Sequence, residues 1–435
     1  MKIKNWKLKI SEQKGQSLVE IMIGLGIGAL LIGSAVLAIT FTLRSSSSTQ
    51  TLRLASEFNQ DLLDRVRAFG KSNWQNIYSL DKGESENYFL NPSGSNLIAI
   101  KGEEGKLEND IGGGLAGHWK FDEAENPPIV TTYDASGNNN TGTLTNGVTK
   151  SSSNCKISNC LNLDGINDYV SVLNSPSIDV TQNLTLSVWV KLNTYVSGGT
   201  NTDRANIVQK TSQYYMTVDS MNGTFDVWLR NLTPVHTSST SVVPLNQWAN
   251  IAITYDGSNI KWYLNGVLDK TLATSGAIGS FSSNLVIGGE PGYGRFANGY
   301  IDDVRVYNRA LSPEEIKRLH NSLIFKRFFF AENICRSNDA ANNITGVLPC
   351  TPGSLEDSST QKITVKSQWI TKAQVATEIG LVDYITRWQN RIFHQTDWSG
   401  GSGVEGPLLE PGSSYSSSTN IDTTGTLGSI RIKGL

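Results

Sequence analysis

The sharpest change in the hydrophobic pattern lies near the start of the chain. Residues 21–43 contain no charged side chain, whereas residues 1–14 carry five lysines and one acid, Glu12. An apolar helix of this length spans about 35 Å, more than a hydrocarbon layer of about 30 Å, and its basic flank stays in the cytoplasm. The pattern predicts one membrane-spanning helix, with the bulk of the chain outside the cytoplasm.

The period of an amphipathic helix follows the apolar segment. Up to Gly70, which can end a helix in the left-handed conformation, apolar residues lie three or four positions apart, at Leu52, Ala55, Phe58, Leu62, Val66 and Phe69. We expect one long helix over residues 16–70. Its first half lies in an apolar layer, and its second half packs one side against a folded domain.

Further along the chain the period falls to two. After a glycine-rich joint at 112–114, apolar residues occupy every second position over 184–192 and 251–255. This alternation is typical of strands with one buried face, and Asn265-Gly266 suits a hairpin turn because both residues tolerate positive φ. Many short strands with such turns predict a sandwich or a jelly roll.

Composition and charge narrow the function classes. The chain has 435 residues, of which 41 are glycine, and 37 basic side chains nearly balance 39 acidic ones for a formal net charge of -2. The length suits two or three domains, and the composition is typical of a β-rich exported protein. Without an excess of Lys and Arg there is no electrostatic footprint for nucleic acid, so no nucleic-acid partner is expected.

The four cysteines fall into two close pairs, Cys155 with Cys160 and Cys335 with Cys350. All four follow the apolar segment, so they would be exported to an oxidising compartment, where each pair can close a short loop. The alternative is four free thiols. Neither a C-x-x-C redox motif nor a Cys/His zinc box is present.

The residues before the apolar segment resemble the processing site of type IV prepilins. That family has a basic leader, a glycine at the cut and a glutamate as fifth residue after it, and here the stretch reads Lys14-Gly15-Gln16-Ser17-Leu18-Val19-Glu20. The resemblance implies that a prepilin peptidase in the membrane removes a leader over 1–15, cutting before Gln16, and methylates the new amino terminus. Gln16 departs from the Phe that is usual there.

Glu20 also has a physical interpretation. A carboxylate at the edge of an apolar helix is costly to bury unless an opposite charge pairs with it. In the pilin family the partner is the free amine of a neighbouring subunit, so other pilin or pseudopilin subunits are expected partners. The alternative is an interfacial glutamate in the headgroup region.

Several stretches in the middle of the chain resemble the laminin-G-like, concanavalin A-like jelly roll. The resemblance covers residues 115–321 and rests on 118–123 (HWKFDE), 134–138 (DASGN), 163–165 (LDG), 168–170 (DYV), 255–257 (YDG) and 300–307 (YIDDVRVY). It closes with a helix start in which Ser312 can cap, Pro313 suits the first helical position and Glu315 completes a capping box.

The jelly-roll fold hosts both binders and glucan hydrolases, so the fold alone does not decide the function. Retaining hydrolases of this fold carry their paired carboxylates as alternate residues of one strand, Glu-x-Asp-x-Glu. No such strand occurs in the sequence, since Asp302-Asp303 are adjacent and Glu314-Glu315 belong to a helix start. We therefore expect a binding module and no enzyme.

A calcium ion is expected in the jelly roll as a structural cofactor. Oxygen-bearing side chains fall at every second residue, at Asp134, Ser136, Asn138 and Asn140. Calcium takes six to eight hard oxygens, and Asp122 or Asp302 would add charge if the sheet ends meet there, as the resemblance suggests. The alternative is an Asx/Gly turn that merely connects two strands.

After the jelly roll, residues 325–336 and 362–369 read as strands and resemble the C-terminal sheet of pilin-like proteins. The jelly roll would then be inserted between 71–114 and 322–435, which is plausible because the termini of a sandwich usually lie close together. The expected fold class is an α+β pilin-like domain, with a long N-terminal helix and a small antiparallel sheet, that carries an inserted all-β jelly roll.

These patterns predict a minor pilin or pseudopilin of a type IV pilus-like fibre, whose jelly roll binds a glycan or a surface protein in adhesion. The precursor would sit in the cytoplasmic membrane as a single-pass protein and then move to an extracellular fibre or the cell surface. One alternative is a structural or priming subunit of a type II secretion or DNA-uptake pseudopilus without a ligand of its own. A second is a membrane-tethered, exported glycan hydrolase.

Overall fold

The computed structural model describes residues 49–93, 96–108, 110–124, 130–233, 236–338, 343–370 and 375–387, together with 421–422 and 431–432. The expected processing residues Gly15, Gln16 and Glu20, and the apolar segment 21–43, lie outside the described residues. Among the described helices, none has the length and apolarity needed to cross a bilayer.

Residues 49–72 form a helix, which extends two residues beyond the predicted end at Gly70. Its apolar side packs on a sheet, because Leu62 and Val66 share one buried cluster with Phe329 and Val365 of that sheet. Polar contacts add to this packing. The Asn59 side chain donates to the Ile379 carbonyl (2.9 Å), and its Oδ1 accepts from the Ser367 hydroxyl (2.6 Å). A short helix, α2 (Gln75–Tyr78), follows.

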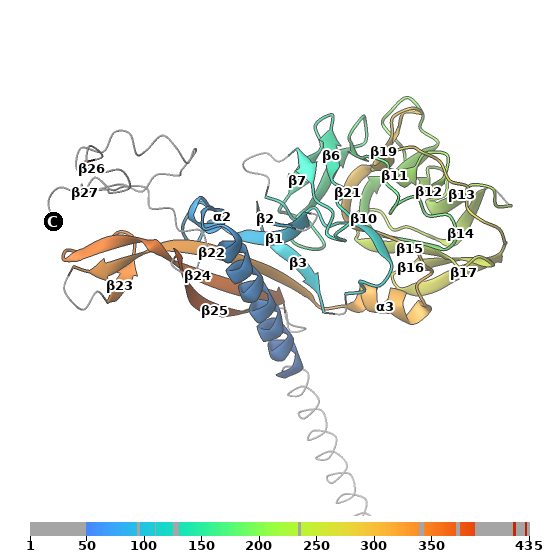
Figure 1. Ribbon diagram of the computed structural model, residues 1–435. Coiled ribbons are helices and arrows are strands. Elements are labelled where there is room, and N and C mark those ends of the chain that lie inside the picture. Colours follow the sequence, from blue (N-terminus) through green and yellow to red (C-terminus); the bar gives the residue numbers. More distant parts are fainter. Residues whose placement is uncertain are drawn as a thin grey trace, which may run out of the picture. The chain divides into compact units, whose positions relative to one another are not determined.

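The sheet beneath this helix, here called the helix-backed sheet, combines strands from two distant parts of the sequence (Figure 1). Its main path is β2-β1-β22-β24-β25, and β3 and β23 also pair with β22. The bounds are β1 (Tyr88–Ser93), β2 (Asn96–Lys101), β3 (Glu104–Leu107), β22 (Ile324–Ser337), β23 (Ile344–Val347), β24 (Ser354–Ile370) and β25 (Ala376–Thr386). Strands that precede and follow the jelly roll thus share one sheet.

The jelly roll consists of two eight-stranded antiparallel sheets. The first, here called the covered sheet, has the path β17-β16-β15-β10-β21-β8-β7 with β4 paired to β21. Its strands are β4 (Leu115–Trp119), β7 (Thr149–Ser151), β8 (Cys160–Asp164), β10 (Leu184–Thr194), β15 (Ala249–Tyr255), β16 (Asn259–Leu264), β17 (Val267–Ala273) and β21 (Asn298–Tyr307).

The second, here called the open sheet, has the path β14-β13-β12-β11-β18-β9-β6-β5. Its strands are β5 (Thr131–Thr132), β6 (Gly142–Thr145), β9 (Tyr169–Val172), β11 (Arg204–Lys210), β12 (Tyr214–Asp219), β13 (Thr224–Leu229), β14 (His236–Val242) and β18 (Leu285–Ile287). Two short ribbons complete the described strands: β19 (Gly289–Glu290) with β20 (Arg295–Phe296), and β26 (Ile421–Asp422) with β27 (Arg431–Ile432).

The two sheets differ in what lies outside them. Between them, the alternating apolar residues predicted over 184–192 enter the main core, as the period of two requires. The outer face of the covered sheet carries a second cluster, in which Trp189 and Tyr263 pack under Ile316 of helix α3 (Pro313–Asn321) and under Leu107. None of the apolar clusters among the described residues lies on the outer face of the open sheet.

Several local predictions are confirmed. Asn265 and Gly266 form the β16–β17 turn with φ of 52° and 75°. Helix α3 begins with the predicted capping box of Ser312 and Glu315. Both disulfides form within their own neighbourhoods, with Cα–Cα distances of 5.4 Å for Cys155–Cys160 and 5.5 Å for Cys335–Cys350.

Candidate functional site

Outward-facing side chains of the open sheet form two adjacent rows. In the first row, Gln209 of β11 pairs with Tyr215 of β12, which pairs with Trp228 of β13. Their strand neighbours Tyr214, Val227 and Leu229 point into the core between the sheets. Because side chains alternate along a strand, the first row must face away from that core.

The second row crosses the same strands and is polar; it lies two residues away on β12 and β13, and three on β11, where the register shifts. Asn206 pairs with Thr217, and Thr217 pairs with Asp226. The Asn206 Nδ2 donates to the Gly289 carbonyl at 3.0 Å, so the β19–β20 ribbon contacts this row. Within the described part of the chain, the buried atoms Asn206 Oδ1 and Thr217 Oγ1 have no hydrogen-bond partner. Asn206, Thr217 and Asp226 are all buried, so this polar row lies beneath the surface beside the aromatic row.

Tyr215 and Trp228 are stacked, with ring centroids 5.3 Å apart and ring planes 10° apart. Both side chains are half-buried, so part of each ring reaches the surface. Aromatic rings at such positions offer a rigid apolar surface at low entropic cost, and the phenol and indole add polar groups at its rim. Burial raises the pKa of Tyr215 to about 12, which keeps its hydroxyl neutral at physiological pH.

An ion cluster borders the aromatic row. Arg295 on β20 donates from Nε and Nη2 to the two carboxylate oxygens of Asp203 (2.6 and 2.8 Å) and from Nη1 to Glu290 (3.0 Å). Its guanidinium also lies 5.1 Å from the ring centroid of Tyr293, which is 60% exposed. This combination of half-exposed aromatic rings and a fixed, partly exposed guanidinium can bind a polar ligand with an apolar face.

Sequence reasoning did not single out these residues. The available signal was local: in β13, Asp226 and Trp228 alternate with the core residues Phe225, Val227 and Leu229. That pattern places an aromatic and an acid on the outer face of one strand. It does not reveal that Tyr215 and Thr217 lie beside them, because the pairing depends on the register between strands.

The predicted calcium loop is closed by its own hydrogen bonds. Asp134 Oδ1 accepts from the backbone N–H groups of His118 and Ser136, both at 2.9 Å. Its Oδ2 accepts from the backbone N–H (3.0 Å) and the side-chain amide (2.8 Å) of Asn140. The Asn138 amide donates to the Leu115 and Ala116 carbonyls. The arrangement is that of the Asx-type turn given as the alternative.

The two further calcium candidates do not join this loop. Asp122 accepts from the backbone N–H of Gly105 (2.6 Å), and Asp302 accepts from those of Lys156 and Ile157 (3.2 and 2.7 Å). Nowhere among the described residues do three His, Cys, Asp or Glu side chains gather as a metal site. The residues present do not fit calcium in this arrangement, and calcium binding stays a prediction that melting curves with and without a chelator check.

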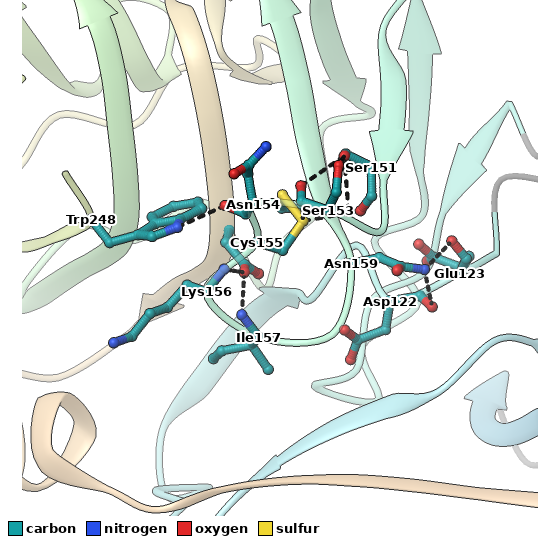
Figure 2. Close-up of a disulfide and its surroundings, with 12 residues drawn as sticks. Asp122, Glu123, Ser151, Ser153, Asn154, Cys155, Lys156, Ile157, Asn159 and Trp248 are labelled. Atoms are coloured by element: carbon teal, nitrogen blue, oxygen red, sulfur yellow. Dashed lines mark hydrogen bonds between the residues drawn. A yellow bond between two sulfur atoms is a disulfide. The ribbon is translucent and has the colours of Figure 1, made fainter. Parts of the chain in front are cut away.

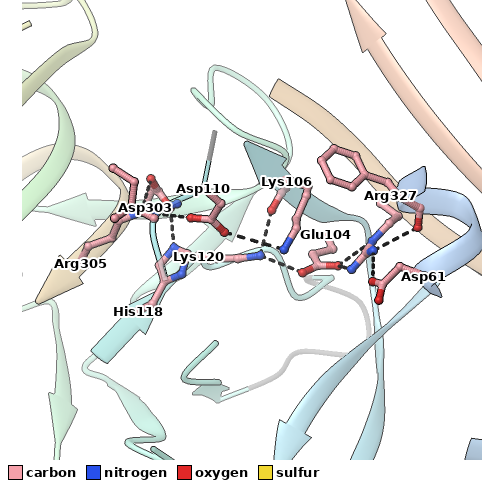
Figure 3. Close-up of polar contacts among 12 residues, drawn as sticks. Asp61, Glu104, Lys106, Asp110, His118, Lys120, Asp303, Arg305 and Arg327 are labelled. Carbon is pink, nitrogen blue, oxygen red and sulfur yellow. Dashed lines mark hydrogen bonds and ion pairs between the residues drawn. The ribbon is translucent and has the colours of Figure 1, made fainter. Parts of the chain in front are cut away.

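A chain of buried charges runs between the jelly roll and the helix-backed sheet (Figure 3). Arg327 on β22 pairs with Asp61 of the helix (2.7 Å) and with Glu104 of β3 (2.6 Å), and Lys120 pairs with Glu104 (2.8 Å). Burial opposes ionisation of Glu104, but the charges of Arg327 and Lys120 outweigh it and hold the pKa of Glu104 well below its usual value. The charges of these residues pair with one another, so their role is to hold the packed elements together.

The second half of this chain lies within the jelly roll. Arg305 pairs with Asp303 (3.0 Å) and Asp110 (2.6 Å), and His118 Nε2 lies 2.6 Å from Asp303. Burial and the charge of Arg305 lower the pKa of His118, so its contact with Asp303 is a hydrogen bond of a neutral imidazole. Asp303 and its neighbour Asp302 therefore have different hydrogen-bond partners.

Comparisons with known proteins concern the jelly roll. Residues 164–317 match the model of the concanavalin A-like lectin/glucanases superfamily. The jelly-roll prediction is confirmed for these residues. No curated protein matches the chain.

Similar solved structures include domain 4 of the extracellular arabinanase AbnA from Geobacillus stearothermophilus, in complex with arabinotriose. It is 19% identical, with 48% of this chain and 98% of that chain covered and a TM-score of 0.39. The binding domain of Paraclostridial Mosquitocidal Protein 1 is 13% identical, with coverages of 63% and 76% and a TM-score of 0.40. The binding domain of botulinum neurotoxin DC in complex with SialylT is 13% identical, with coverages of 61% and 73% and a TM-score of 0.38.

Proposed function

We propose that this protein is a minor pilin or pseudopilin whose jelly roll binds a glycan on the outer face of the open sheet. The observation that carries the binding proposal is the stacked pair Tyr215–Trp228 on a sheet face that no apolar cluster of the described residues covers. Sugars present an apolar C–H face, which suits the half-exposed rings of Tyr215 and Trp228, and a polar rim, which suits the partly exposed guanidinium of Arg295 beside them.

The pilin part of the proposal is supported by two features. The first is the processing motif around Gly15 and Glu20, which precedes an apolar segment over 21–43. The second is the helix 49–72, which packs its apolar side on an antiparallel sheet. A subunit of this kind would present its jelly roll on a fibre at the cell surface.

We propose binding without catalysis. Retaining glycosidases need two carboxyl groups about 5 Å apart, one ionised and one protonated. On the open sheet, the carboxylates of Asp203 and Glu290 are both engaged by Arg295. Detectable hydrolysis of a bound glycan would contradict this part of the proposal.

Glycan-array binding by the full-length protein in detergent tests the binding site. We expect Trp228→Ala and Tyr215→Ala each to weaken binding at least tenfold, because each removes half of the stacked pair. Trp248→Ala is the matched control, since Trp248 is also a half-buried aromatic but donates to the Asn154 carbonyl beside the covered sheet. Equal losses for all three variants, or no glycan bound by the wild type, would contradict the site.

Mass spectrometry of the membrane protein tests the pilin assignment separately. We expect a mature chain that begins at Gln16 with a methylated amine, and no processing in Gly15→Ala. Glu20→Ala should be processed but fail to enter fibres. Processing and fibre entry without glycan binding would favour the structural or priming subunit of a pseudopilus.

A further inference from the structure

The loop between β7 and β8 touches both folded parts of the molecule. This loop comprises residues 152–159, and within it Cys155 forms a disulfide with Cys160, the first residue of β8 (Figure 2). On the jelly-roll side, the backbone N–H groups of Lys156 and Ile157 donate to Asp302, and the Asn154 carbonyl accepts from the Trp248 indole (2.8 Å).

On the other side, the same loop contacts the start of the helix-backed sheet. The Ser158 hydroxyl donates to the Glu103 carbonyl at 2.7 Å, just before β3. Ile157 packs so closely on β3 that a Cβ built on Gly105 would lie 2.2 Å from its Cγ2. Since β3 pairs with β22, the loop connects the jelly roll to the sheet on which the helix lies.

We propose that the Cys155–Cys160 disulfide is a redox-controlled latch, which holds the jelly roll against the helix-backed sheet while it is oxidised and releases that contact when it is reduced. Hydrogen bonds to Asp302, Trp248 and Glu103 also hold the loop, and the disulfide is the covalent constraint on it. Within it, Ser158 adopts φ of 42°, which a residue other than Gly, Asn or Asp rarely holds without a constraint.

If the loop lost its conformation, Asp302 would lose its hydrogen-bond donors. This carboxylate is fully buried, and in the described structure its Oδ2 accepts only from the loop while its Oδ1 has no partner. A loosened loop would leave a buried carboxylate without donors, close to the charges of Asp122 and Asp303. Opening would therefore admit water at the contact between the two folded parts.

The chemistry requires a dithiol reductant. One of its thiolates attacks Cys155, whose side chain is half-buried whereas Cys160 is fully buried, so the S–S bond breaks and Cys160 leaves as a thiolate that takes up a proton. The second thiol of the reductant then attacks the mixed disulfide. It releases Cys155 as a thiol, and the reductant ends as a disulfide.

Hydrogen exchange of the full chain in detergent, read by mass spectrometry before and after dithiothreitol, tests the latch. We expect exchange in β3 and in residues 153–159 to become at least tenfold faster on reduction, while β12 of the open sheet keeps its protection. The double variant Cys155→Ser, Cys160→Ser should show the fast exchange without reductant and no further change with it.

The matched control is the second disulfide. Cys335 and Cys350 join β22 to the end of a neighbouring loop within the helix-backed sheet, so Cys335→Ser with Cys350→Ser should leave exchange in β3 unchanged. Gly105→Ala should loosen the same contact by displacing Ile157, with the disulfide intact. Unchanged exchange in β3 after reduction would overturn the proposal, and so would loss of protection in β12, which would mean that the disulfide merely holds the jelly roll folded.

Discussion

Beside the outer faces of the two jelly-roll sheets, arginines paired with carboxylates differ in burial. On the covered sheet, Arg305 is 2% exposed and its charge is met by Asp303 and Asp110 beneath other parts of the chain. Beside the open sheet, Arg295 of the β19–β20 ribbon also pairs with two carboxylates but stays partly exposed near half-buried aromatic rings. A buried charge must find all its partners inside the protein, whereas an exposed one can still meet a ligand.

Arg327 of the helix-backed sheet extends this comparison of buried and partly exposed charges, and it provides the largest expected effect. Its side chain is fully buried between Asp61 and Glu104, so Arg327→Ala should lower the free energy of unfolding by about 3–5 kcal/mol, the usual cost of breaking a buried ion pair. Arg295→Ala on the β19–β20 ribbon should cost about 1 kcal/mol or less, because its pairs are partly screened by solvent. Denaturant unfolding followed by tryptophan fluorescence measures both, and equal losses would remove the distinction between a buried and a partly exposed ion pair.

The adjacent residues Asp302 and Asp303 should respond to the same substitution with opposite signs. Burial, followed by the charges of Asp122 and Asp303, raises the pKa of Asp302 well above its usual value. Burial opposes ionisation of Asp303 too, but Arg305 and His118 lower its pKa. Asp303→Asn should therefore cost about 2–4 kcal/mol at pH 7, and Asp302→Asn should stabilise by about 1–3 kcal/mol.

The dependence of stability on pH checks the predicted signs of the Asp302→Asn and Asp303→Asn effects. A raised carboxyl pKa means that wild-type stability falls as the pH rises from about 4 towards the folded pKa, so the gain from Asp302→Asn should appear only above about pH 4. The stability that Asp303 contributes is present above about pH 4 and is lost as the pH falls towards its lowered pKa. A destabilised Asp302→Asn variant at pH 7 would contradict the raised pKa of Asp302.

Replacing threonine by valine should lower the free energy of unfolding by different amounts in the two sheets, and the difference is smaller than for the charged residues. Thr185 in the covered sheet donates to the Arg309 carbonyl (2.7 Å) and accepts from the Leu311 N–H (2.9 Å), so Thr185→Val should cost about 1–3 kcal/mol. Thr217 Oγ1 has no partner in the described structure, so Thr217→Val should change stability by less than about 1 kcal/mol. A large loss of stability would show that the Thr217 hydroxyl is already satisfied.

The last prediction concerns how the free energy of unfolding changes with pH through Lys82, a residue outside the jelly roll. Burial lowers the pKa of Lys82 to about 8, and its ammonium donates to the Ile77 carbonyl. Between pH 8 and about 10.5 the unfolded chain holds this proton more tightly, so wild-type stability should gain from a rising pH. Lys82→Met should remove that increase in unfolding experiments over this range, and an identical slope in both proteins would contradict the lowered pKa.

Features encoded within a few neighbouring residues could be predicted from the sequence. The Asn265-Gly266 turn, the capping box of Ser312 and Glu315, the alternating strands and the two local disulfides all depend on contacts between residues close in the chain. The jelly roll followed because its strand and turn pattern repeats over much of the chain and its motifs resemble a known family.

Contacts between distant residues required the folded chain. Asp134 looked like a cation ligand, but His118, Ser136 and Asn140 bring four N–H donors to its carboxylate. Arg327 meets Asp61 across 266 positions, which no local pattern reveals. The register that sets Tyr215 beside Trp228, and the presence of α3 over one sheet but not the other, arise from the packing of whole elements. Periodicity determines which side of a strand is apolar, but only tertiary contacts determine what lies against the other side.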